Sequence, residues 1–264
     1  MKIEDIFPKG FVSSPNNSGP FLKTKIIDVP TAIVIHFTAG SSGASSAAWL
    51  KNPDSKASAH VVVDYDGKII PVVHPTLRAW HAGSSQLMGV PGCNNFTLGI
   101  EVANPGPLTK NADGSMKTVF NALWPGRFMT AVQGLETRYY ASYTEAQFVA
   151  VKQLCQLLCN TFSIDPAMIV GHEHVSPGRK VDPGPAWDWS RFDDMITSPG
   201  GPGRYFLLQH LIEINGHDLG EIDGVFGPKS FAALKALTGE SLTKLSDTDQ
   251  LRLIKDLRKR RPKL

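Results

Sequence analysis

Apolar and polar positions along the chain predict an α/β fold. Residues 32–38 and 168–170 are continuous apolar runs, which is typical of strands buried in an open sheet. Residues 98–104 predict another strand, in which alternation puts Gly99 and Glu101 on one face with only small neighbours. We expect the space above that face to admit a ligand beside the carboxylate.

A β-hairpin is predicted at residues 60–65 and 68–73. The pair Asp66-Gly67 lies between two β-branched runs and provides the positive φ that a tight turn requires. Pro71 has no N–H to donate to a neighbouring strand, so we expect the second strand at a sheet edge or at a bulge.

A capping box predicts where a long helix begins. Thr144 and Gln147 have the spacing at which each side chain accepts a hydrogen bond from the other's backbone, and Tyr143 and Phe148 are placed for a hydrophobic staple. Apolar positions continue along one side to about Phe162. We therefore expect this helix to cover one face of the sheet.

Two segments show no clear period. Residues 1–30 are predicted to be irregular. Residues 105–142 are interrupted by Pro-Gly and Asp-Gly pairs and contain several aromatic side chains. This composition predicts a long loop, and the aromatic content favours an ordered wall of a cleft.

One domain boundary is visible in the composition. Residues 197–203 are rich in Pro, Gly and Ser and predict a linker between a domain of residues 1–196 and a domain of residues 204–264. The second domain begins with an apolar helix at 205–212 and ends with a helix at 246–261. The predicted architecture is a mixed central β-sheet flanked by helices, followed by a small three-helix domain.

Composition narrows the functional classes. The chain has 264 residues, 42% hydrophobic, and a net charge of +3, which is compatible with an anionic polymer but too small to indicate nucleic acid. Three cysteines argue against a disulfide framework, and Cys155 and Cys159 are expected to be core thiols. No apolar run suits a signal peptide or membrane span, so we expect synthesis in the cytoplasm and export only through another agent.

The segment 171–185 carries candidate chemistry. It follows a buried strand and is rich in Gly and Pro, so it is a constrained loop that can aim His172, Lys180 and Asp182 at one point. An imidazole and a carboxylate are metal ligands, and a lysine can stabilise a developing oxyanion. The segment alone fits an ordinary polar loop equally well, with His172 bonded to backbone.

A second histidine makes the metal site more specific. His36 ends a predicted strand, where active sites of open α/β sheets gather. With His172 and Asp182 it would give zinc three protein ligands and leave the fourth position for water. Glu101 would then take the proton of the attacking water, and Lys180 would bond the carbonyl oxygen as it turns negative. Spacing alone does not choose these two among eight histidines.

Four blocks in this order resemble the zinc-dependent N-acetylmuramoyl-L-alanine amidases of the type 2 family, relatives of the peptidoglycan recognition proteins. The blocks are residues 35–40, 78–83, 99–106 and 171–185. The match covers roughly residues 30 to 195.

The resemblance implies one zinc ion per chain, held by His36, His172 and Asp182, with Glu101 as the general base and Lys180 as the oxyanion stabiliser. The bond cleaved in that family joins the lactyl group of N-acetylmuramic acid to the L-alanine of the stem peptide. The alternative from another class is a non-catalytic peptidoglycan receptor. The complete ligand set favours the enzyme.

Other residues of the matched blocks are expected in the substrate cleft. His81 and Asn104 correspond to cleft positions, although a histidine bonded to loop backbone would look the same as His81 in sequence. Trp80 can stack on sugar or peptide, or pack in the core. His174 is expected to contact a ligand residue rather than the metal, or to lie on the surface. Cys93 is a further possible ligand, but Asp182 already supplies the third one.

The segment 223–227 resembles a small three-helix peptidoglycan-binding module with an Asp-Gly and Phe-Gly-Pro hallmark. The matching residues are Asp223, Gly224, Phe226 and Gly227. Such a module would raise the local concentration of the enzyme on an insoluble polymer. The alternative is a helical cap that only stabilises the first domain. The basic end 258–261 is expected to be a solvated terminus, or a contact for anionic envelope polymers or lipid head groups.

These features together predict a monomeric hydrolase of peptidoglycan or its muropeptides. A wall substrate without an export signal favours a bacteriophage or prophage lysis enzyme, released to the cell wall in the periplasm by a membrane-permeabilising, holin-like partner. A cytoplasmic amidase that recycles soluble muropeptides is the alternative within the same chemistry. The carboxy-terminal module argues against it, because a soluble substrate needs no anchor.

Overall fold

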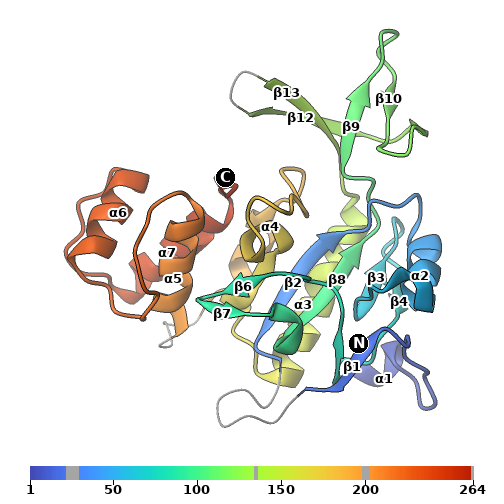
Figure 1. Ribbon diagram of the computed structural model, residues 1–264, viewed down its shortest axis with the longest axis horizontal. Helices are drawn as coiled ribbons and strands as arrows, with labels where there is room; N and C mark the ends of the chain where they lie inside the picture. The colour runs from blue at the N-terminus through green and yellow to red at the C-terminus, as the bar shows by residue number, and fades with distance from the viewer. Residues whose placement is uncertain (22–29, 134–135, 198–202, 263–264) are drawn as a thin grey trace.

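A mixed five-stranded sheet forms the centre of the chain in the computed structural model, which describes residues 1–21, 30–133, 136–197 and 203–262 (Figure 1). Its strands, in spatial order, are β14 (Ile169–Gly171), β2 (Ala32–Phe37), β8 (Thr97–Val102), β3 (Val61–Val63) and β4 (Ile69–Pro71). The first four are parallel and β4 is antiparallel. The predicted α/β class is confirmed, and Pro71 lies on the edge strand, as expected.

The register of the parallel strands positions the site. His36 on β2 is opposite Glu101 on β8, and Ile35 is opposite Gly171 at the end of β14. Parallel strands bring their carboxyl ends to the same sheet edge. The segment that follows β14 therefore begins next to His36.

Helix α3 (Glu145–Phe162) packs on the sheet and begins as predicted. Thr144 and Gln147 form the capping box, and the rings of Tyr143 and Phe148 lie 5.9 Å apart. Cys155 and Cys159 are free thiols buried on its inner side, which confirms that expectation.

Shorter elements complete this part of the chain. They are α1 (Ile3–Ile6), β1 (Asn17–Pro20), α2 (Gly43–Lys51), η1 (Pro53–Ser55), β5 (Leu77–Ala79), β6 (Gln86–Leu87), β7 (Val90–Pro91), η2 (Cys93–Asn95), η3 (Pro166–Met168), α4 (His172–Val175) and η4 (Trp189–Met195). Residues 1–21 are more regular than predicted, because β1 pairs with β5.

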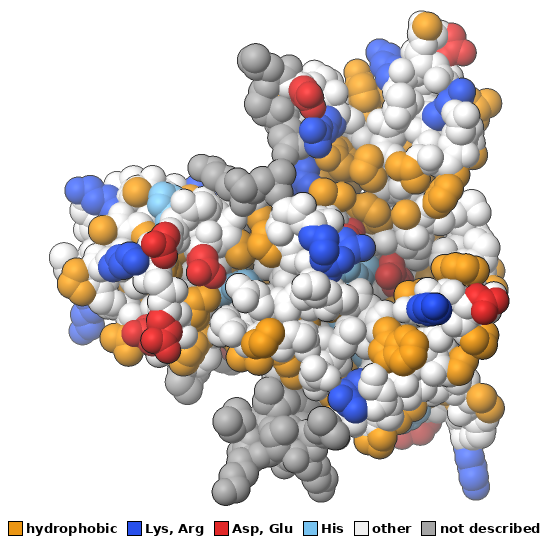
Figure 2. Space-filling model, in the orientation of Figure 1, with side chains coloured by type: hydrophobic (Ala, Val, Ile, Leu, Met, Phe, Trp, Pro, Cys, Tyr) orange, Lys and Arg blue, Asp and Glu red, His pale blue; other side chains and the backbone are white. Residues whose placement is uncertain are grey.

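The prediction of a long loop at residues 105–142 is wrong. This segment is a second, antiparallel sheet of β11 (Leu123–Trp124), β10 (Met116–Lys117), β9 (Pro107–Lys110), β13 (Glu136–Ala141) and β12 (Phe128–Gln133). It projects from the central domain as an arm (Figure 1). Figure 2 shows hydrophobic side chains along this arm and at its base. Two of its strands, β10 and β11, have only two residues each, which offers too few alternating positions to predict a strand from sequence.

Three helices follow the central domain: α5 (Gly203–Ile214), α6 (Pro228–Thr238) and α7 (Asp247–Arg258). The predicted helices are present, and most of the expected linker at 197–203 lies outside the described residues. Leu211 and Leu257, from α5 and α7, belong to the same buried apolar cluster as Trp189 and Ile169. His210 donates a hydrogen bond from Nε2 to the His174 carbonyl at 2.9 Å.

The basic carboxy-terminal end is solvated only in part, because Lys259 and Arg260 are exposed whereas Arg258 is buried and Arg261 is half-buried. Arg258 is buried, with its guanidinium 4.9 Å from the Trp189 ring centre and 3.4 Å from Asp193 Oδ1. Lys259 Nζ lies 2.7 Å from Asp193 Oδ2. Arg261 pairs with the buried Glu173 at 3.2 Å.

Among the described residues, no helix has both the length and the apolar character to cross a membrane.

Candidate metal centre and active site

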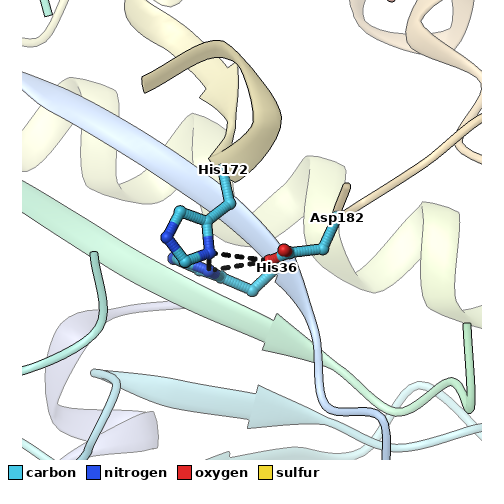
Figure 3. Close-up of side chains that lie close together, drawn as sticks. All are labelled: His36, His172 and Asp182. Carbon is cyan, nitrogen blue, oxygen red and sulfur yellow. Dashed lines mark hydrogen bonds and ion pairs between the residues drawn. The ribbon is translucent and has the colours of Figure 1, made fainter. Parts of the chain in front are cut away.

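Three buried side chains converge at the carboxyl edge of the sheet. His36 ends β2, His172 opens α4, and Asp182 lies in the loop that follows (Figure 3). The Nδ1 atoms of His36 and His172 are 2.8 Å apart. Asp182 Oδ2 lies 3.1 Å from His36 Nδ1 and 2.9 Å from His172 Nδ1. The structure thus brings together the three ligands that the resemblance implied.

The chemistry of this donor set fits a metal ion. Burial and the neighbouring His172 lower the pKa of His36 to about 4, so its imidazole is neutral at pH 7. Burial opposes ionisation of Asp182, but its close contacts with His172 and His36 outweigh that effect and hold its pKa well below the ordinary value. Two histidines and one carboxylate form a ligand set typical of mononuclear zinc sites.

Glu101 lies beside these ligands, in register with His36 on the adjacent strand. Burial raises its pKa well above the ordinary value; Asp182 raises it further, and Lys180 opposes the shift. Its Oε2 is buried without a hydrogen-bond partner among the described residues. A buried carboxylate with a raised pKa has the increased proton affinity that a general base requires.

Lys180 is half-buried in the loop between α4 and Asp182. Its backbone N–H donates to the Ser176 carbonyl at 3.0 Å, which fixes the turn just before the ligand. Its charge is near enough to act on the pKa of Glu101 and of His36. The loop therefore carries a cation next to the three ligands.

His81 occupies a different place from the substrate-lining position expected for it. Its ring is buried, Nδ1 lies 3.0 Å from His36 Nε2, and Nε2 lies 3.3 Å from the Thr97 carbonyl. Both ring nitrogens are thus occupied by protein partners. A Cβ at Gly99 would collide with the His81 ring. The space above Gly99, which we expected to admit a ligand, is filled by His81.

Trp80 and Asn104 also make contacts within the protein. The Trp80 indole N–H donates to Ser18 Oγ at 2.7 Å. Asn104 is buried; its Oδ1 accepts from the Gly106 N–H at 2.7 Å and its Nδ2 donates to the Ala141 carbonyl at 3.2 Å. Asn104 therefore joins the two ends of the arm, and a substrate contact from either residue stays a prediction.

His174 and Cys93 lie outside the cluster of three ligands. His172 and His174 are on one helical turn, and residues two apart on a helix do not face each other. His174 accepts from the Gly171 N–H and lies against Trp189. Burial raises the pKa of the Cys93 thiol to about 11, which disfavours a thiolate ligand.

Sequence reasoning missed two polar residues behind the histidines. Arg179 Nη2 donates to the Ala82 carbonyl at 2.6 Å and to the Ser84 carbonyl at 2.8 Å. Asn94 Oδ1 accepts from the N–H groups of His81 and Ala82, at 3.0 and 2.7 Å. The only sequence signal for either residue was its position in a matched block or beside Cys93.

The segment 223–227 forms a turn between α5 and α6. Asp223 Oδ1 accepts from Gln209 Nε2 at 2.9 Å and from the Val225 N–H at 2.8 Å. Gly224 has a φ of +74°, and a Cβ there would collide with Phe206. Phe226 packs on Phe231, and Gly227 precedes α6 as its N-cap. These residues hold the helices together, and their expected role in wall binding stays a prediction.

An α/β sheet with a buried His, His, Asp set at its carboxyl edge defines a class of metal-dependent hydrolases. The sequence matches the N-acetylmuramoyl-L-alanine amidase family over residues 27–185, more than half of the chain and including all three candidate ligands. The chain belongs to this family of N-acetylmuramoyl-L-alanine amidases.

Individual relatives agree with this assignment. The chain is 28% identical over 186 residues to the 1,6-anhydro-N-acetylmuramyl-L-alanine amidase AmpD of Enterobacter cloacae, covering 64% of this chain and 82% of that one. It is 29% identical over 166 residues to the amidase AmiD of Escherichia coli, covering 60% and 50%. A solved structure of AmiD has a similar fold, with a TM-score of 0.53 and 21% identity, over 90% of this chain and 91% of that chain.

Proposed function

We propose that this chain is a zinc-dependent amidase that releases the stem peptide from anhydro-muropeptides, the fragments of degraded peptidoglycan. The observation that carries this proposal is the buried set of His36, His172 and Asp182 within the matched family region. The substrate class is supported by the relatives. Those from E. cloacae and E. coli are named for the 1,6-anhydro form, and the AmiD structure is titled as a complex with an anhydro-N-acetylmuramic acid tripeptide.

The residues around the ligands supply the proton chemistry. Zinc, when bound, acts as a Lewis acid and makes water reactive at neutral pH. Glu101 accepts a proton at its unpartnered Oε2 from the water that attacks the amide carbonyl, and returns a proton to the leaving amine of L-alanine. Lys180 donates a hydrogen bond to the carbonyl oxygen as it becomes negative. The C–N bond then breaks, giving a muramic acid carboxylate and a free peptide.

Mass spectrometry of the products tests this proposal. Purified protein with an anhydro-N-acetylmuramyl peptide should give a peptide that begins with L-alanine and a sugar that ends in the lactyl acid. A chelator should stop the reaction, and added zinc should restore it. If zinc-loaded protein binds the muropeptide but leaves it intact, the result favours the non-catalytic receptor.

A second candidate is a wall-degrading lysis enzyme, supported by the resemblance at 223–227 and by the helices that carry it. In that role the protein would act on the cell wall after release by a holin-like partner. Initial rates on anhydro-muropeptide and on insoluble sacculi separate the two candidates. Faster cleavage of the soluble fragment supports our proposal, and faster solubilisation of sacculi supports the lysis enzyme.

A further inference from the structure

Both candidate histidine ligands are held from behind by one two-residue segment. The Nε2 atom of His36 lies 3.0 Å from His81 Nδ1, and the Nε2 atom of His172 lies 3.1 Å from the Ala82 carbonyl oxygen. His81 and Ala82 are adjacent, so one two-residue segment contacts the outer nitrogen of both rings, through the side chain of His81 and the backbone carbonyl of Ala82.

The hydrogen-bond partners determine which nitrogen of His172 carries the proton. A carbonyl oxygen only accepts hydrogen bonds, so the contact with Ala82 requires an N–H at His172 Nε2. A histidine that coordinates a metal ion is neutral and has a single N–H. In that state Nδ1 of His172 presents its lone pair to the candidate metal position beside His36 and Asp182.

The hydrogen bonds of His81 determine which nitrogen of His36 carries the proton. Nε2 of His81 faces the Thr97 carbonyl at 3.3 Å and Thr97 Oγ1 at 3.2 Å, and that hydroxyl donates its own proton to the Cys93 carbonyl at 2.8 Å. His81 must therefore donate from Nε2 and accept at Nδ1. It accepts from His36 Nε2, which leaves the lone pair of His36 at Nδ1 also directed at the candidate metal position.

The two-residue segment is itself fixed on both sides. Asn94 Oδ1 accepts from both of its backbone N–H groups, at 3.0 and 2.7 Å. Arg179 Nη2 donates to the Ala82 carbonyl at 2.6 Å. Because Arg179 lies in the loop that carries Asp182, the third ligand is joined to the same segment that orients the other two.

We propose that His81 is a positioning residue of the metal site, which acts with Asn94 and Arg179 to present Nδ1 of both histidines to the ion, rather than a substrate contact. This inference rests on the proposed zinc site. Outer hydrogen bonds of this kind fix the tautomer and orientation of a ligand, and their loss weakens metal binding about 10- to 100-fold.

Zinc affinity of His81 variants, measured by competition with a chelator, tests the inference. His81→Phe removes the acceptor for His36 Nε2 and should weaken zinc binding about 10- to 100-fold. His81→Asn offers an amide oxygen near the position of Nδ1 and should restore most of the affinity. KM for the muropeptide, measured with saturating zinc, should stay within about twofold of wild type in both variants, because the ring does not contact substrate.

His60→Asn is the matched control. His60 is as deeply buried as His81, its ring centre is 5.9 Å from that of His81, and its nitrogens bond to Leu77 and Gly99. Its zinc affinity should remain that of wild type. Thermal unfolding of each variant identifies any that does not fold. If His81→Phe does not fold, Arg179→Lys replaces it in the test. This variant loses the planar contacts to Ala82 and Ser84 and should bind zinc more weakly than wild type.

Two results would overturn the inference. Wild-type zinc affinity in folded His81→Phe, with an increased KM, would make His81 a substrate contact. Equal losses of affinity in His60→Asn and His81→Phe would assign the effect to general destabilisation. Failure of the proposed function is recognised separately, because wild-type protein would then bind no zinc, and the inference would fall with it.

Discussion

At the scale of single residues, the site depends on three hydrogen-bond acceptors that meet in the interior. His36, His172 and Asp182 each offer a lone pair within 3.1 Å of the next. Buried polar atoms without a donor are costly, so this arrangement is stable only with a cation or a proton among them. Oε2 of the adjacent Glu101 has no hydrogen-bond partner in the described part of the chain and can take the proton of the reaction.

Glu101→Gln tests that division of roles. The amide keeps the size of the carboxyl group but cannot take a proton, so turnover of the muropeptide should fall about 10²- to 10⁴-fold. Zinc content, measured by elemental analysis, should remain that of wild type because Glu101 is not a ligand. Undiminished turnover in this variant would remove Glu101 from the mechanism.

His60 predicts that stability decreases in mildly acidic solution. Its Nδ1 accepts from the Gly99 N–H, its Nε2 donates to the Leu77 carbonyl, and burial lowers its pKa from 6.5 to about 4. The unfolded chain therefore binds this proton at higher pH than the folded chain does. The stability that depends on neutral His60 is present above pH 6.5 and is lost as the pH falls toward 4.

Denaturant unfolding of wild type and His60→Gln at pH 7.5 and pH 5 measures this effect. His60 should account for a decrease of roughly 2 kcal/mol in the free energy of unfolding between the two pH values. The variant, which has no titrating group at this position, should show a decrease smaller by about that amount. The same decrease in both proteins would contradict the assignment.

The metal ligands were accessible to sequence reasoning because their blocks resemble a family, but the polar contacts behind them were not. His81 and His36 are 45 residues apart, and Arg179 reaches Ala82 across 97 residues. Such contacts arise only when separate strands and loops come together, and nothing local in the sequence encodes them. His81 therefore looked like a cleft residue.

At the scale of elements, the carboxyl ends of β2 and β14 and the strand β8 assemble the site. Gly99 on β8 is the position where this packing is tightest, because the His81 ring occupies the place of its missing side chain. The space provided by one glycine thus lets a loop histidine reach the outer side of His36. The register of β2 and β8 then puts Glu101 next to the ligands.

Gly99→Ala should disturb this packing. The added methyl group would force the His81 ring to move, and overpacking of a core typically costs about 1–3 kcal/mol. We expect a lower melting temperature together with weaker zinc binding, measured by calorimetry and by chelator competition. A variant with unchanged melting temperature and zinc affinity would show that the ring can move without consequence.

Elements with a local signal were predictable, and those that depend on distant pairing were not. The capping box of α3 and the Asp66-Gly67 turn involve neighbours in sequence, and both are found in the structure. The sequence predicts a loop for the arm because Pro-Gly and Asp-Gly turns dominate its composition, although β12 pairs with the consecutive strand β13 and β9 with β10. The pairing of β9 with β13, some 30 residues away, has no local signal at all.

At the scale of the whole molecule, the carboxy-terminal helices and the central domain share one apolar core. Leu207 and Leu257 are buried in the same cluster as Trp189 and Phe192, and Arg258 reaches the Ile169 carbonyl on β14. The sequence predicts a boundary at 197–203 but not this packing, since a run of basic residues looks solvated until its distant partners are known.

Removal of residues 203–264 should therefore destabilise the central domain. The truncation exposes a buried apolar surface and leaves Asp193 without its partners Arg258 and Lys259. We expect a lower melting temperature and reduced turnover of a soluble muropeptide, in addition to any loss of binding to sacculi. A truncated protein with wild-type stability and soluble turnover would instead identify the helices as a separable wall-binding module.

The most direct test of the catalytic zinc site is a zinc titration of metal-free protein, with cleavage of an anhydro-muropeptide measured at each step. We expect no turnover without metal, and a turnover that rises in proportion to bound zinc up to one ion per chain. Asp182→Ala should remain inactive throughout, because it lacks one of the three ligands. Full turnover in metal-free protein, or in Asp182→Ala, would contradict a catalytic zinc site at His36, His172 and Asp182.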